Sequence, residues 1–107
     1  MKIIDIEGKS FEYFDGNCQL SIGSHATMYY SFDLTKYPNY KDIFIERYNN
    51  RKRFDIKSNK YIAFNNIIKY IDLDLTNNTL GITTRCDVLE IIPMDERRAV
   101  ILEELLK

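Results

Sequence analysis

Few side chains in this sequence suit nucleophilic catalysis. His25 is the only histidine, and the two cysteines, Cys18 and Cys86, lie far apart in the chain. A Cys–His pair needs the thiol beside the imidazole and a third group that orients the ring, and nothing in the sequence indicates an oxyanion hole. We therefore interpret His25 as a half-exposed residue at the end of a strand, and we predict that the chain is not an enzyme.

Asp72 and Asp74 are the most suggestive pair of carboxylates. On a strand, side chains two residues apart share a face, so these two would lie roughly 6.5–7 Å apart. That separation suits the carboxylates of a glycoside hydrolase or a loose cation site. The alternation of residues 71–75 explains them more simply as the solvated face of an amphipathic strand. The four glycines stand alone and form no phosphate-binding loop. We predict neither a metal site nor a cofactor.

Charged residues are distributed unevenly along the chain. Residues 41–60 carry seven Lys and Arg against three acids, whereas residues 61–107 carry five basic and eight acidic residues. Most of these cations lie in residues 47–53, RYNNRKR, which we call the basic turn. The residues predicted to bind a partner are Arg47, Tyr48, Arg51, Lys52 and Arg53.

Three interpretations of the basic turn remain open. Basic side chains neutralise phosphates and aromatic rings stack on bases, so the turn could contact nucleic acid. It could also be a solvated hairpin tip. Alternatively, it could meet an acidic neighbour, and the acidic second half of the chain suits head-to-tail docking of one subunit on the next.

A long strand with one buried face is the clearest structural element. Positions 26, 28, 30, 32 and 34 are apolar, with mostly polar residues between them. Alternate side chains of a strand point to opposite faces, so this period of two predicts one face in a core. The residues predicted to be buried there and in the later alternation are Ala26, Met28, Tyr30, Phe32, Leu34, Ile71, Leu73 and Leu75.

Similar patterns predict a series of short strands joined by turns. The turns are Asp15-Gly16-Asn17, as a tight hairpin, residues 58–60, and residues 76–78. Several strands at this spacing indicate a mainly β fold, a small antiparallel barrel or sandwich of six to nine strands. The expected strands are residues 2–6, 10–14, 18–22, 26–34, 54–57, 61–64, 67–75, 79–84 and 86–92.

Three stretches depart from this pattern. Residues 35–41 read as a loop around a proline. Residues 42–48 fit either a strand or two helical turns, and their Ile, Phe and Tyr content favours a strand. At the end of the chain, Asp95 can cap a C-terminal helix over about residues 95–106, with leucines along one stripe.

Length and composition are those of one soluble domain over residues 1–107. No apolar run approaches the roughly 20 residues of a membrane-spanning helix, so we expect no membrane association. The acids near the N-terminus do not fit a signal peptide, which predicts synthesis in the cytoplasm. There the two cysteines are expected to be thiols, although a bridge between Cys18 and Cys86 stays open.

Three segments together resemble a known family. Residues 21–28 (SIGSHATM), 61–68 (YIAFNNII) and 80–87 (LGITTRCD) resemble, in that order, the small β-barrel domains of bacteriophage tail-hub proteins and type VI secretion spike proteins. The resemblance covers roughly residues 18–92. It implies a non-enzymatic, ring-forming part of a phage tail, baseplate or related contractile injection assembly, without cofactor.

On that resemblance, the partners are other subunits of the same protein or neighbouring tail proteins, and the protein is a virion component. Two alternatives stand beside it. One is a nucleic-acid-binding β-barrel that uses the basic turn, and the other is a small phage inhibitor of a host protein.

Overall fold

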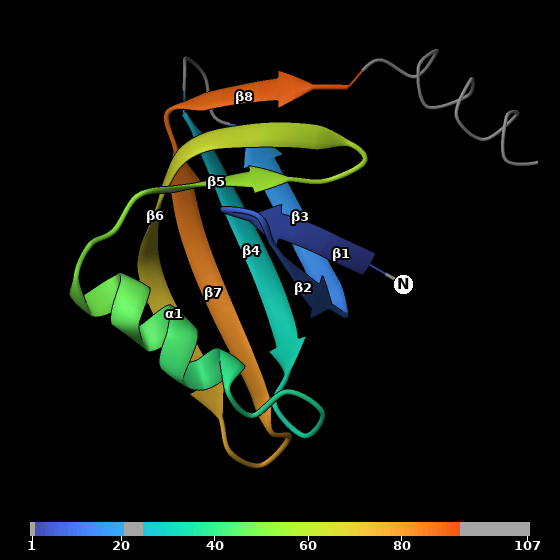
Figure 1. Cartoon of the computed structure of the whole chain (residues 1–107), viewed down its shortest axis with the longest axis vertical. Coiled ribbons are helices and arrows are strands. Elements are labelled where there is room, and N and C mark those ends of the chain that lie inside the picture. The colour runs from blue at the N-terminus through green and yellow to red at the C-terminus, as the bar shows by residue number, and fades with distance from the viewer. Residues whose placement is uncertain (1, 21–24, 93–107) are drawn as a thin grey trace, which may run out of the picture.

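A computed structural model of the chain describes residues 2–20 and 25–92, and most of these residues lie in strands (Figure 1). The helix and strands are β1 (Lys2–Ile6), β2 (Lys9–Tyr13), β3 (Asp15–Leu20), β4 (Ala26–Asp33), α1 (Tyr40–Asn49), β5 (Phe54–Lys57), β6 (Tyr61–Asp74), β7 (Thr79–Cys86) and β8 (Val88–Ile91).

All pairings between these strands are antiparallel. Seven strands follow one path in the order β2-β1-β5-β6-β7-β4-β3, and β8 pairs with β6 beside that path. The path does not close, because β2 and β3 at its two ends are joined through Phe14 but do not pair with each other. The prediction of a mainly β, antiparallel fold with six to nine strands is therefore confirmed.

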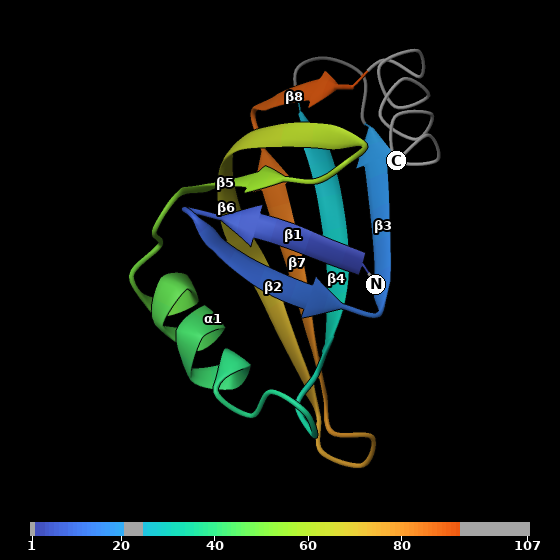
Figure 2. The same cartoon turned by 45° about the vertical axis from the view of Figure 1, so that its right-hand side comes forward.

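The long strand β6 belongs to both halves of the sheet. Its first part pairs with β5 and β8, and its second part pairs with β7. Figure 2 shows β6 curving from one half of the molecule to the other. The bend lies at Asn65, which has a positive φ of 54° and donates its backbone N–H to the Asp55 carboxylate at 3.1 Å.

The neighbouring Asn66 is fully buried and holds the bend in place. Its amide donates to the backbone carbonyls of Phe54, at 3.3 Å, and Ala63, at 2.9 Å, and its oxygen accepts from the Thr84 hydroxyl at 3.0 Å. The two expected strands, residues 61–64 and 67–75, are thus a single strand. The prediction of two separate strands was wrong, because Asn65 and Asn66 bend the strand without interrupting it.

The core lies between the curved sheet and α1. Phe44 of α1 packs against Phe11 and Phe32, with ring centroids 5.3 and 4.7 Å apart. The ring of Tyr40, one helical turn earlier, is nearly perpendicular to that of Phe32, with the two centroids 5.7 Å apart. The remaining fully or almost fully buried apolar residues come from the strands and include Ile4, Ile6, Met28, Tyr30, Ile56, Leu80 and Ile82.

The predicted buried residues fall into two groups. Ala26, Met28, Tyr30 and Phe32 are buried, as predicted, and Leu34 and Ile71 are partly buried. Leu73 and Leu75 were wrongly predicted, since Leu75 is 74% exposed and Leu73 is also exposed. The β6–β7 hairpin extends past the N-terminal end of α1 (Figure 1), so the helix does not cover the tip of the hairpin.

The segment 42–48 is helical, so the preference for a strand was wrong. Tyr40, Phe44 and Arg47 are its buried residues, at positions i, i+4 and i+7, which is the spacing of one helical face. The β-favouring residues Ile43 and Ile45 lie beside this face and are half-buried. Packing against the sheet therefore overrides their local preference.

The hairpin predicted at Asp15-Gly16-Asn17 is also wrong. Strand β3 begins at Asp15 and pairs with β4, and Gly16 has no positive φ. Its lack of a Cβ serves close packing, because a Cβ there would lie 2.9 Å from the Tyr13 ring. The tight turn lies instead between β1 and β2, where Glu7 and Gly8 have φ values of 50° and 81°, as a type I′ turn requires.

The predicted C-terminal helix, residues 95–106, lies outside the described residues. Within the described part of the chain, no helix has the length and apolar character needed to cross a membrane.

The core assignment can be checked with a matched pair of truncations. Phe32→Ala should lower the free energy of unfolding by about 3–5 kcal/mol, because it leaves a cavity beneath α1. Leu75→Ala should change it by about 0.5 kcal/mol or less, because that side chain is solvated. Urea denaturation measures both, and equal losses in the two variants would contradict the assignment.

Candidate functional site: the basic turn

The basic turn leads from the end of α1 towards β5, and backbone hydrogen bonds define its shape. The N–H of Arg51 donates to the carbonyl of Tyr48 at 3.2 Å, and the N–H of Lys52 donates to the carbonyl of Arg47 at 3.1 Å. This pair of bonds is the Schellman motif, which places one residue in the left-handed conformation. That residue is Arg51, with a φ of 48°, where glycine is usually found.

Arg47 is buried, unlike the other cations of the turn. The residue is only 7% exposed, and its guanidinium donates to the Glu7 carboxylate at 2.9 Å and lies 5.3 Å from the centroid of the Phe54 ring. It therefore ties the end of α1 to the β1–β2 turn. Arg47 was predicted to bind a partner. In the fold its guanidinium instead pairs with Glu7 of the same chain.

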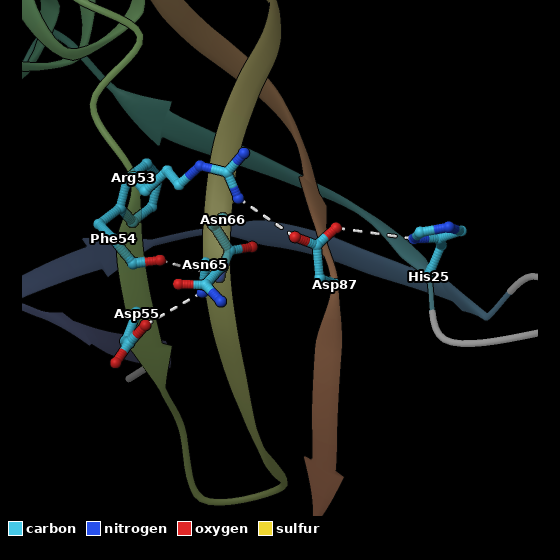
Figure 3. A network of polar contacts seen from close by, with 7 residues as sticks. All are labelled: His25, Arg53, Phe54, Asp55, Asn65, Asn66 and Asp87. Carbon is cyan, nitrogen blue, oxygen red and sulfur yellow. Dashed lines mark hydrogen bonds and ion pairs between the residues drawn. The ribbon is translucent and has the colours of Figure 1, made fainter.

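Arg53 is exposed but paired. Its guanidinium lies 3.2 Å from the Asp87 carboxylate, whose other oxygen is 3.6 Å from Nδ1 of His25 (Figure 3). This ion pair ties the end of the turn to the connection between β7 and β8. His25 is half-exposed just before β4, as predicted.

Arg51 and Lys52 are exposed between these two anchors. Among the described residues, neither forms an ion pair with a carboxylate. The turn thus presents two cations on a backbone that is fixed at both ends. Cations that the fold leaves unneutralised are suited to a carboxylate or phosphate of another molecule.

A groove of about 330 Å³ lies beside Arg51. It is lined by Tyr48, Asn49 and Arg51 from the helix end and by residues 67–69 of β6. Strand β5 pairs with β6 only as far as Asn66, so this edge of β6 has no strand partner in the described part of the chain. Tyr48, predicted as a contact residue, is 42% exposed at the groove.

Sequence reasoning missed Lys69, which is the second cation of the groove after Arg51. The register between β6 and β7 shifts between Ile68 and Tyr70, so Lys69 sits at an irregularity in the strand and is exposed. No local signal marks a β-bulge of this kind. Its place beside Arg51 follows from the bend of β6.

The carboxylates considered for catalysis have a structural role or lie in solvent. Asp74 accepts hydrogen bonds from the backbone N–H groups of Thr76 and Asn77 and from the Asn77 amide. The bonds from Asn77 lower the pKa of Asp74, with a smaller contribution from Thr76. Asp72 is exposed on the strand, as predicted for a solvated face.

The sheet register separates the two cysteines. Cys18 lies opposite Met28 on one side of β4, and Thr84, two residues before Cys86, lies opposite Met28 on the other side. Their Cα atoms are therefore at least two strand spacings apart, roughly 9.6 Å. A disulfide needs a Cα separation below about 7 Å, so a bridge would require the backbone to move.

Comparison with protein-family models, with curated proteins and with solved structures finds no match to this chain. What the basic turn does must therefore be argued from its own geometry.

The ion pair between Glu7 and Arg47 predicts a pH dependence of stability. The hydrogen bond from Arg47 lowers the pKa of Glu7 from its ordinary value of 4.5, and the charges of Arg47, Lys52 and Lys9 act in the same direction. A carboxylate with a lowered folded pKa stabilises the fold above the unfolded value and loses this contribution as the pH falls through the folded value.

Glu7→Gln should therefore be less stable than the wild type at pH 7, and the difference should narrow as the pH falls below 4.5. Urea denaturation of both proteins from pH 7 to pH 2 measures this difference in the free energy of unfolding. In an Arg47→Met background the same substitution should make little difference at any pH. A stability difference between wild type and Glu7→Gln that stays constant down to pH 2 would contradict the ion pair.

Arg51→Gly should raise the free energy of unfolding by about 0.5–1 kcal/mol, because relief of left-handed strain exceeds the added entropy of glycine in the unfolded chain. Lys52→Gly is the control, since Lys52 has no positive φ, and it should not stabilise the fold. Thermal denaturation of both variants tests the assignment, and a destabilised Arg51→Gly would argue against the Schellman motif.

Proposed function

We propose that the chain is a non-enzymatic structural protein whose copies assemble through the basic turn, as a component of a phage tail or a related contractile injection assembly. The observation that carries the proposal is the presentation of Arg51 and Lys52. Both cations are exposed and form no ion pair with the described residues, on a backbone held by the anchors Arg47–Glu7 and Arg53–Asp87.

A fixed backbone favours a contact surface over an idle loop. Binding through a flexible loop costs conformational entropy, and a preorganised loop avoids most of that cost. Here the arginine in the left-handed position of the Schellman motif makes the fold less stable than a glycine would. Retaining arginine there is understandable if its side chain makes a contact outside the subunit.

The tail-like assembly rests on the resemblance of residues 21–28, 61–68 and 80–87 to small tail-hub and spike barrels. A mainly antiparallel, strongly curved sheet is compatible with such a barrel. We infer that the curved sheet acts as the rigid body of a subunit and that the basic turn provides its contact.

Reversing the free charges of the turn tests the proposal. Arg51→Glu with Lys52→Glu should abolish self-association, because like charges then meet across the interface. The melting temperature should change little, since both residues are exposed. Lys57→Glu with Lys60→Glu makes the same change in net charge at another exposed site and should assemble like the wild type.

Light scattering over a range of concentrations measures the assembly. A wild type that stays monomeric at the highest concentration, or a turn variant that still assembles, would contradict the proposal. Arg51→Gly is a useful companion, because it should weaken assembly while it stabilises the subunit.

Binding of single-stranded nucleic acid is the second candidate function. It is favoured by the exposed ring of Tyr48 beside Arg51 and Lys69 in the same groove, because cations and an aromatic ring together suit phosphates and bases. Oligonucleotide binding that weakens steeply with salt, and is lost in the turn variant, would support this candidate over self-assembly.

A further inference from the structure

A second hollow lies at the opposite end of α1 from the basic turn. It has a volume of about 360 Å³, and its lining includes Glu12, Tyr13 and Phe14 at the end of β2, together with Asp33, Lys36 and Tyr37 after β4. We call it the acidic aromatic pocket. Phe14 is 51% exposed although it is a large apolar residue.

Glu12 is the polar centre of this pocket, and its carboxylate is held in position. The Tyr37 hydroxyl donates to one of its oxygens at 2.6 Å, and the Lys36 ammonium lies 3.6 Å from the other. The hydrogen bond to Glu12 raises the pKa of Tyr37 above its ordinary value of 10.0.

The pocket already holds a cation of its own chain. Besides its contact with Glu12, the Lys36 ammonium lies 5.5 Å from the centroid of the Tyr37 ring. A carboxylate and an aromatic face together are the groups that recognise a cation. Lys36 is 60% exposed and its distance from Glu12 is long for an ion pair, so a better-fitting cation can displace it.

An arginine is the better-fitting cation. Its planar guanidinium stacks on aromatic rings and is less strongly hydrated than an ammonium. Of the four described arginines, Arg47 and Arg53 are engaged in ion pairs, whereas Arg51 and Arg85 are exposed without one. Arg51 has a second exposed cation, Lys52, next to it in the chain, and Arg85 lies within strand β7. The basic turn therefore carries an available arginine with a second cation beside it, which the acidic aromatic pocket is suited to bind.

We propose that the acidic aromatic pocket of one copy receives Arg51 and Lys52 of a second copy, in a head-to-tail contact. The inference rests on the proposed function, since it names the surface on which the basic turn docks. Opposite charge on the two surfaces is the reason for choosing a second copy as the partner.

The fold prevents a copy from binding its own turn. The pocket lies by the connection that leads into α1, and the turn lies at the far end of the helix (Figure 1). Ten helical residues separate them, a rigid length of about 15 Å. Because the two surfaces differ, the contact is heterologous and generates a ring or an open chain rather than a two-fold dimer.

Two variants that each break one side of the contact provide the test. The turn variant is Arg51→Glu with Lys52→Glu, and the pocket variant is Glu12→Gln with Phe14→Ala. We expect self-association to weaken on the order of a hundredfold in the turn variant, where like charges meet, and about tenfold in the pocket variant, where one charge pair and one ring are lost. Sedimentation velocity measures each variant alone and a one-to-one mixture.

The mixture distinguishes a head-to-tail contact from other modes of assembly. The turn variant keeps an intact pocket and the pocket variant keeps an intact turn, so one good contact forms between them. We expect the mixture to form dimers and to stop there, while each variant alone remains monomeric at the same concentration.

Lys36→Ala gives a prediction of opposite sign, because it removes the ion pair to Glu12 and keeps the hydrogen bond from Tyr37 to that carboxylate. Removing the competing cation should tighten self-association by up to about fivefold, the worth of an exposed ion pair. If Lys36 had only a structural role, its removal would not tighten the assembly.

The outcomes separate the two proposals. A pocket variant that assembles like the wild type, a mixture that stays monomeric, or a Lys36→Ala variant that associates no more tightly would overturn the pocket while leaving assembly through the turn intact. A monomeric wild type would overturn the proposed function, and the pocket with it.

Discussion

The bend of β6 at Asn65 and Asn66 is the constraint on which the rest of the structure depends. A strand that turns sharply exposes backbone groups to an apolar interior, where an unpaired polar group is costly. The buried Asn66 amide meets two of these carbonyls, and Thr84 satisfies its oxygen. Because β6 passes through both halves of the sheet, this local arrangement sets the curvature that encloses the core.

The position of the basic turn follows from that curvature. Beyond the bend, β5 leaves β6, and α1 packs against the curved sheet beside the edge that β5 has left. Arg47 then lies between the end of α1 and the β1–β2 turn, where its ion pair with Glu7 compensates part of its loss of hydration. The buried cation holds the turn in place, and the two cations that follow Asn50, Arg51 and Lys52, are exposed.

The molecule is therefore polarised along its only described helix, although its net charge is −1. Unneutralised cations lie at one end of α1, and carboxylates among aromatic rings lie at the other. Net charge alone suggests no particular partner, because it averages over these two surfaces. This charge separation is the basis of the head-to-tail contact that we propose, since two different surfaces in contact generate a ring or a filament.

The sequence by itself determined the strands in which buried and exposed side chains alternate. Residues 26–33 and 54–57 show their period of two directly, because each side of a strand faces one environment. Tertiary structure decided the helical state of residues 42–48, the burial of Arg47, the exposure of Leu73 and Leu75, and the meeting of Lys69 with Arg51. In each case the conformation or burial of the residue depends on whether a segment distant in sequence packs against it. Helix α1 covers the core, for example, whereas the residues beyond the helix face solvent. That information is long-range, so no pattern within a few neighbouring residues contains it.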